Sequence, residues 1–182
     1  MTFTEQDYLN FQRKVEHYQE VLKNAEHYRE YWNKTLKNDL LNVLQKAVEL
    51  AKLACTVEER SEIQNLGAIV LSLGVSRSGL GEPVGNGLHR ELIKQNGSLV
   101  YQQLFNGKVL VLINLPYIEK YGEPLPPKTL AIYRPEELKE PYIIRHLESF
   151  MSEITTWEDY DDDRPDENQR IGFKLNFEQE EK

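Results

Sequence analysis

Apolar residues recur at alternating steps of three and four through the first 36 residues, and we call this set of positions the seam. Its members are Tyr8, Phe11, Val15, Tyr18, Leu22, Ala25, Trp32 and Leu36, with Arg29 as the one break. A repeat of 3.5 residues keeps a narrow apolar line on one side of a helix. Because no Gly or Pro occurs before Gly67, nothing interrupts a helix here. Thr4, with Asp7 three residues later, indicates a capped start.

The seam changes phase near residue 36. The steps from Trp32 to Leu36 and from Leu36 to Leu40 are both four, which breaks the heptad as a stutter or as a turn between two helices. Asn33 and Asn38 favour a bend or hairpin near 33–39. Beyond it a wider apolar face, suited to packing on a sheet, is predicted on one more helix; it comprises Leu40, Leu41, Val43, Leu44, Ala47, Val48, Leu50 and Ala54.

Shorter elements follow. Thr56 to Glu59 has the spacing of a capping box and predicts a short helix ending near Gly67, and a buried strand is expected over 68–75. Asn106-Gly107 between two β-prone runs predicts a two-residue hairpin that joins 98–105 to 108–115 and pairs Val100 with Ile113. Further strands are predicted over 128–133 and 170–177, with a helix that opens at Pro135 and restarts at Pro141.

These elements predict an α+β fold, with a long N-terminal helical arm or helical hairpin followed by a mostly antiparallel sheet of about five strands packed by helices. We expect four segments: the arm over 1–55, an α+β body over 56–157, an acidic loop over 158–169, and a C-terminal strand and tail over 170–182.

The composition and charge of the chain exclude some classes of function. The 182 residues carry a formal net charge of −8, and residues 135–182 alone hold six basic and fifteen acidic side chains, a net of −9. Such a chain does not bind nucleic acid by bulk electrostatics, which needs clustered Lys and Arg. No apolar run has the roughly 18 residues of a membrane span, and the N-terminus lacks the pattern of a secretory signal. We therefore expect a cytoplasmic protein that does not enter membranes.

A single cysteine, Cys55, excludes an internal disulfide framework and a multi-cysteine metal site. The four histidines do not have metal-ligand spacing. We accordingly predict no metal and no cofactor, and the chain contains none of the catalytic motifs that we sought.

One segment suggests a ligand site. Residues 74–87 are rich in glycine and lie between a predicted strand and a predicted short helix over 88–95, an arrangement that can cradle a phosphate group. The candidate ligand-binding residues are Ser76, Arg77, Ser78, Gly79, Gly81 and His89. Neither a P-loop nor a Gly-x-Gly-x-x-Gly pattern fits, so the alternative is a surface loop that binds nothing.

The seam carries the leading functional hypothesis. An aromatic-rich line of this length must be covered, either by the chain's own second helix or sheet or by a second copy of the chain. We favour a non-enzymatic interaction or assembly protein whose arm drives homo-oligomerisation, a dimer above all, and whose body binds an unknown protein partner. The alternatives are a regulatory domain that binds a phosphate- or nucleotide-type ligand through 74–87, and an enzyme with an unfamiliar site around Arg77, His89 and Glu91.

Overall fold

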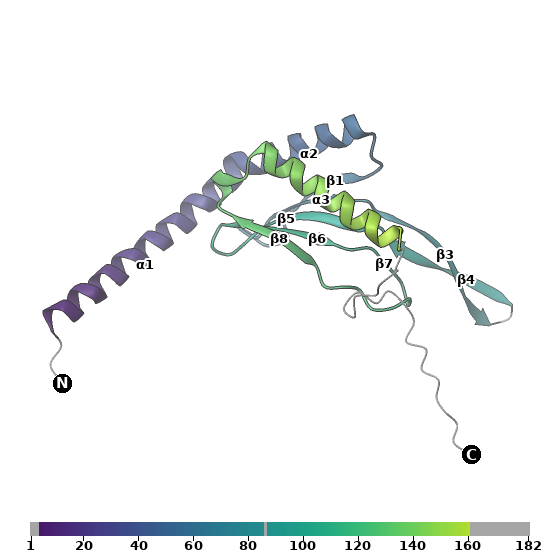
Figure 1. Cartoon of the computed structure of the whole chain (residues 1–182), viewed down its shortest axis with the longest axis horizontal. Helices are drawn as coiled ribbons and strands as arrows, with labels where there is room; N and C mark the ends of the chain where they lie inside the picture. Colours follow the sequence, from purple (N-terminus) through teal and green to yellow (C-terminus); the bar gives the residue numbers. More distant parts are fainter. Residues whose placement is uncertain (1–3, 86, 161–182) are drawn as a thin grey trace, which may run out of the picture.

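The computed structural model describes residues 4–85 and 87–160. It shows an α+β chain in which one long helix is followed by two antiparallel sheets and a final helix, as the sequence predicts (Figure 1). The long helix projects from one end of the molecule and a β-hairpin from the other. Among the described residues, no helix is long and apolar enough to cross a membrane.

The N-terminal helix continues without a turn from α1 (Glu5–Tyr31) through a π-helical segment (Trp32–Leu36) into α2 (Lys37–Ala51), so the predicted hairpin near 33–39 is wrong. Thr4 and Asp7 form the predicted capping box. The π segment coincides with the two steps of four. Its wider turn keeps residues spaced by four on one side, and the buried residues Trp32, Leu36, Leu40 and Leu44 follow that spacing.

The larger sheet has the order β1-β2-β5-β6-β8. Its strands are β1 (Thr56–Arg60), β2 (Ala68–Ser72), β5 (Ser98–Gln103), β6 (Val109–Asn114) and β8 (Lys128–Tyr133). The short helix predicted after Thr56 is therefore wrong. Residues 56–60 pair antiparallel with β2 along their whole length, and this pairing overrides the local capping signal.

The β5–β6 hairpin is present, but its register differs from the prediction by one residue. Val100 pairs with Leu112 and not with Ile113. The turn holds three residues, because the Leu104 amide donates to the Lys108 carbonyl at 2.8 Å. A two-residue turn of this type needs a positive φ at both Asn106 and Gly107, but only Gly107 has one, at +77°. A one-residue shift moves every side chain to the opposite face.

The smaller sheet has the order β3-β4-β7, with β3 (Val75–Gly85), β4 (Leu88–Gln95) and β7 (Tyr117–Ile118). Residues 88–95 are thus a strand and not the predicted helix. Gly85 and Gly87, with φ of +92° and +73°, flank the turn that returns the chain along β3. This hairpin extends beyond the larger sheet (Figure 1).

The core lies between the larger sheet and two helices on one of its faces, α2 and α3 (Glu140–Glu158). Pro135 opens a short 3-10 turn (Pro135–Glu137) and Pro141 lies in the first turn of α3, as predicted. The fully buried side chains include Leu40, Leu71, Tyr101 and Phe150. The strand predicted over 170–177 and the acidic loop from residue 161 onward lie outside the described residues; Glu158 is the last residue of α3.

Candidate functional site

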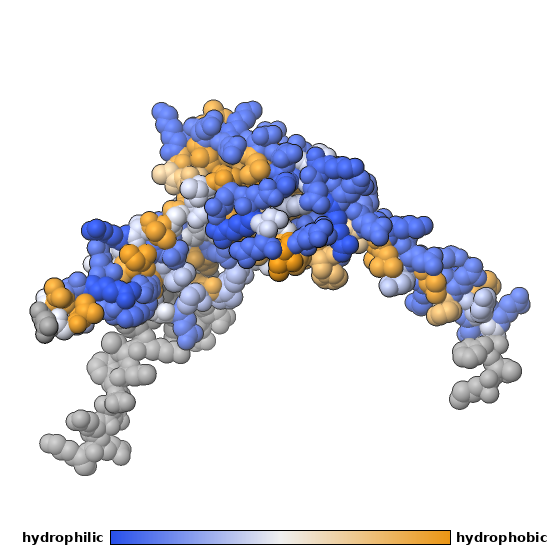
Figure 2. All heavy atoms as spheres, turned by 180° about the vertical axis from the view of Figure 1, so that it is seen from behind, coloured by the Kyte–Doolittle hydropathy of each residue, from blue (hydrophilic) through white to orange (hydrophobic). Residues whose placement is uncertain are grey.

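The first part of the seam is exposed. Tyr8, Phe11 and Tyr18 expose 67%, 64% and 62% of their surface, and Leu22 exposes 49%. Helix α1 contains no buried residue. Apolar side chains are visible along this projecting rod in Figure 2. From here on, the arm means residues 5–24 only, the exposed first part of the predicted segment 1–55. Tyr8, Phe11, Tyr18 and Leu22, together with the half-buried Val15, form the open seam.

The second part of the seam is covered by the chain itself. Trp32 and Leu36, which the sequence analysis placed in an interface with Tyr8 and Phe11, are 1% and 2% exposed and belong to the core of the protomer. Ala25 is half-buried where the arm reaches the β5–β6 turn. The predicted interface is thus reduced to the open seam, because the larger sheet covers the later positions.

The break in the seam at Arg29 has a structural role. Its guanidinium group donates a hydrogen bond to the carbonyl oxygen of Phe105 in the β5–β6 turn. The turn also approaches the helix closely: a Cβ atom added to Gly107 would lie 2.7 Å from Tyr28 Cβ and 2.8 Å from the Ala25 carbonyl oxygen. The turn therefore lies against α1 where the arm ends, and the Phe105 side chain, 75% exposed, is at this junction.

The candidate ligand residues lie on the β3–β4 hairpin and do not converge on one site. The Ser76 hydroxyl is hydrogen-bonded to Asn96 at 2.8 Å, and the Ser78 hydroxyl donates to the Leu92 carbonyl at 2.6 Å. His89 pairs in register with Pro83, and Gly81 with Glu91. With a strand in place of the helix at 88–95, the predicted strand–loop–helix cradle is not formed.

An internal carboxylate already occupies the groups that would hold an anion. Glu91 Oε1 accepts a hydrogen bond from the Gly79 amide at 3.3 Å, and its Oε2 lies 3.6 Å from Arg77 Nη1. Because the Glu91 carboxylate already lies beside the Arg77 guanidinium group, it competes with any external phosphate for this cation. The structure offers no support for a ligand site built on Arg77 and Gly79.

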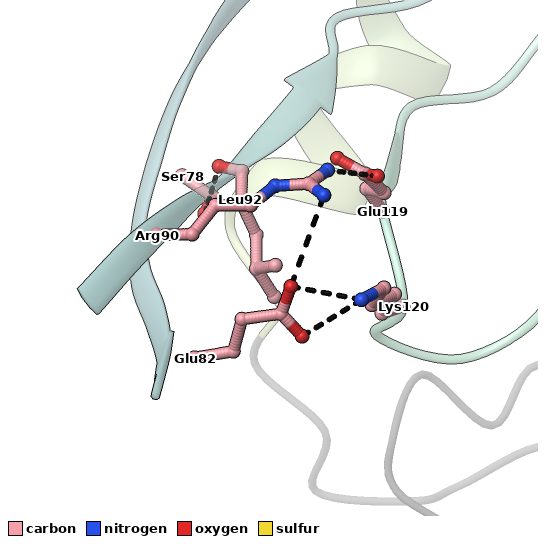
Figure 3. Close-up of polar contacts among 6 residues, drawn as sticks. All are labelled: Ser78, Glu82, Arg90, Leu92, Glu119 and Lys120. Carbon is pink, nitrogen blue, oxygen red and sulfur yellow. Dashed lines mark hydrogen bonds and ion pairs between the residues drawn. The ribbon is translucent and has the colours of Figure 1, made fainter. Parts of the chain in front are cut away.

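A surface ion-pair network joins the β3–β4 hairpin to β7 and the residues that follow it (Figure 3). Arg90 pairs with Glu119 and lies 3.9 Å from Glu82, whose carboxylate also receives Lys120 Nζ at 2.8 Å. The Glu119 carboxylate raises the pKa of Arg90, and Arg90 in turn lowers the pKa of Glu119. The network links the part of the hairpin near its turn to the residues after β7, and since the groups are partly exposed to solvent, each pair contributes little to stability.

The sequence analysis missed a buried polar cluster on α3. His146 lies between Tyr101, whose hydroxyl is 3.3 Å from Nδ1, and Tyr133, whose hydroxyl is 3.1 Å from Nε2. Burial lowers the pKa of His146 and raises that of Tyr101. The signal in the sequence was spacing: Ile143, His146, Phe150 and Ile154 recur at steps of three and four, which places the histidine on the inward face of the helix.

Comparisons with known proteins do not assign the chain to a group. No family model matches it, and neither a curated protein nor a solved structure does. Among the described residues, the open seam is the main candidate for a functional surface.

Proposed function

We propose that this chain is a self-associating assembly protein in which the open seam of one copy covers the open seam of another. The observation that supports the proposal is the contrast along one helix. Aromatic seam residues on the arm expose more than 60% of their surface, whereas Trp32 and Leu36 on the same seam are buried. A single exposed helix gains little stability from its own residues, so an arm of this composition needs a packing partner.

The charge of the arm suits a second copy. Between residues 5 and 24 there are four acidic side chains (Glu5, Asp7, Glu16 and Glu20) and three basic ones (Arg13, Lys14 and Lys23), a net of −1. Two arms of nearly zero net charge repel each other weakly. A narrow seam with a 3.5-residue repeat also matches the packing geometry of paired helices.

The area of the open seam is close to what a small dimer interface needs. Tyr8, Phe11 and Tyr18 each expose about two-thirds of side chains that measure about 200 Å², which is roughly 130 Å² each. With Val15 and Leu22, one arm presents roughly 500 Å², so complete covering of both open seams would bury roughly 1,000 Å² at most. That upper bound equals the threshold for a specific interface, about 1,000 Å².

In this proposal the α+β body is the part that binds other proteins. The β3–β4 hairpin projects away from the arm and exposes Val84 and Leu88 near its turn. Exposed apolar side chains on a projecting hairpin are typical of protein contact surfaces. Self-association through the arm would present two such bodies in one assembly.

The test is the mass of the full-length chain by multi-angle light scattering. We expect a dimer for the natural chain and a monomer for Phe11→Glu/Tyr18→Glu, because four carboxylates, two from each copy, would be buried in the paired seam. Gln6→Glu is the matched control. It adds a carboxylate on the opposite side of the same helix and should leave the mass unchanged.

A monomeric natural chain at about 100 µM would overturn the proposal. A dimer that persists in the double variant, with an unchanged circular dichroism spectrum, would show that another surface mediates association.

A further inference from the structure

We infer that the two arms pair antiparallel, with residues 4–22 of one copy alongside residues 22–4 of the other. This inference rests on the proposed function and adds the segment and orientation of the partner. It starts from the position of the β5–β6 turn, which covers the seam side of the helix where the open seam ends.

The turn limits how a second helix can approach. Gly107 lies so close to Ala25 and Tyr28 that even one added carbon would collide, and Arg29 binds the Phe105 carbonyl oxygen. The space beside residues 25–29 is therefore filled by the chain's own turn. A partner helix can pack along the arm only as far as Leu22.

A parallel pair conflicts with this limit. In register, it would bring Ala25 and Arg29 of both copies to the same level, with helix axes about 8–10 Å apart. Two β5–β6 turns and two bodies would then meet at one end. An antiparallel partner ends at Thr4, at the level of Leu22, and its body lies at the other end of the pair.

Packing within the seam also favours the antiparallel orientation. A parallel pair stacks Phe11 on Phe11 and then Val15 on Val15, so a wide layer is followed by a narrow one. The antiparallel pair places Phe11 opposite Val15 in both central layers. Opposing a large and a small side chain fills the space between helices more evenly.

The outer layers complete the antiparallel match. Tyr8 lies opposite Tyr18, and Leu22 lies opposite the capping residue Thr4. Of the charged groups beside the seam, Asp7 is at the level of Gln19 of the other copy, and Lys14 lies one residue from the level of the two-fold axis, close to its own copy. A lysine there keeps its ammonium group in water while its aliphatic stem packs along the seam.

Distances between spin labels test the orientation in the full-length chain, with Cys55→Ser as background. A label at Lys23→Cys should lie roughly 30 Å or more from its copy in the antiparallel pair, because each label is ten helical residues from the two-fold axis. In a parallel pair the same labels are at one level, and the distance falls to roughly 20 Å or less. Lys23 is exposed, so the label does not disturb the seam.

Arg13→Cys is the matched control, since residue 13 is at the level of the two-fold axis, on the outer side of the helix, and is also exposed. Its label should lie within about 30 Å of its copy in either orientation. A short Arg13 distance with a long Lys23 distance supports the inference. Short distances at both positions overturn the antiparallel orientation and leave the proposed self-association intact. The absence of any dipolar coupling at Arg13 means that no arm pair forms, and it overturns both.

Discussion

At the scale of single residues, Arg29 and Gly107 decide where the arm separates from the body. Arg29 interrupts the seam because its side chain binds the Phe105 carbonyl oxygen and not an apolar neighbour. Gly107 allows the β5–β6 turn to approach the helix, since it combines a φ of +77° with backbone and side-chain atoms that leave no room for a Cβ. These two residues join the helix to the sheet across a long separation in sequence.

Gly107→Ala is therefore expected to destabilise the fold by about 2–4 kcal/mol, the sum of a left-handed alanine and overpacking against Tyr28. Gly74→Ala is the matched control. Gly74 has a similar φ of +71° with nothing within 4 Å of an added Cβ, so its cost is that of the backbone alone, about 1–2 kcal/mol. Urea unfolding of both variants measures the difference. Equal losses would contradict the close contact between turn and helix.

His146 makes the stability of the fold depend on pH. Burial lowers the pKa of His146 from its ordinary value of 6.5, so between its unfolded and folded pKa values the unfolded chain binds the proton more readily. The contribution of neutral His146 to the free energy of unfolding is complete above about pH 6.5. It is lost as the pH falls toward the lower pKa that His146 has in the folded protein. For one proton the slope does not exceed about 1.4 kcal/mol per pH unit.

The matched variant is His146→Gln, which keeps polar partners for Tyr101 and Tyr133 but does not titrate. We expect the natural chain to lose more unfolding free energy than this variant between pH 7.5 and pH 5.5. Urea titrations at both pH values give the two differences. If the losses are equal, His146 does not carry the pH dependence.

At the scale of elements, the first helix belongs to both the arm and the core. Its residues up to Leu22 contribute to no buried cluster, whereas Trp32, Leu36, Leu40 and Leu44 are part of the core. The π-helical segment at Trp32–Leu36 makes this possible, because it realigns the seam with the sheet without ending the helix.

Truncation should separate the two roles. Removing residues 1–22 is expected to leave the thermal midpoint of the protomer unchanged and to abolish self-association. Removing residues 1–36 also deletes Trp32 and Leu36, which costs more than about 5 kcal/mol in buried side chains and is comparable to the stability of a whole domain. Circular dichroism on heating tests both. A cooperative transition in the longer deletion would show that the sheet folds without these residues.

The sequence predicted those elements whose signals are local. The capped helix start at Thr4, the strands around Asn106-Gly107 and the helix opened by Pro135 are confirmed, since periodicity, turn residues and caps act over a few positions. The strands at 56–60 and 88–95 were predicted as helices because their pairing partners decide their conformation. The register of β5–β6 shifted by one because Asn106 does not adopt the left-handed conformation.

In the candidate site too, local features were predictable and long-range contacts were not. The positions of the seam were predictable from spacing alone, but which of them are exposed was not, because the limit at Ala25 depends on a turn about 80 positions later. The contact of Glu91 with the Gly79 amide, across the hairpin, was likewise not predictable from local sequence. Long-range contacts of this kind produce no periodic pattern in the amino-acid sequence.

At the scale of the whole molecule, the charge distribution predicts how association responds to salt. The arm is nearly neutral and its open seam is apolar, so the proposed dimer does not depend on ion pairs. We expect its dissociation constant to change less than threefold between 50 mM and 500 mM NaCl, measured by sedimentation equilibrium. Screening of the two Lys14 groups would strengthen association slightly. A tenfold weakening in high salt would indicate an ionic interface elsewhere.

The unbroken path of the first helix from the arm into the core has a mechanical consequence. With no joint between them, a pair of chains would act as a rigid spacer, and the two Ala25 residues would be held about 36 Å apart by helical rise alone. The distance between the two α+β bodies would then be set by the number of residues in the arm. Inserting one heptad into the arm should lengthen this distance by about 10 Å while keeping the orientation of the paired surfaces.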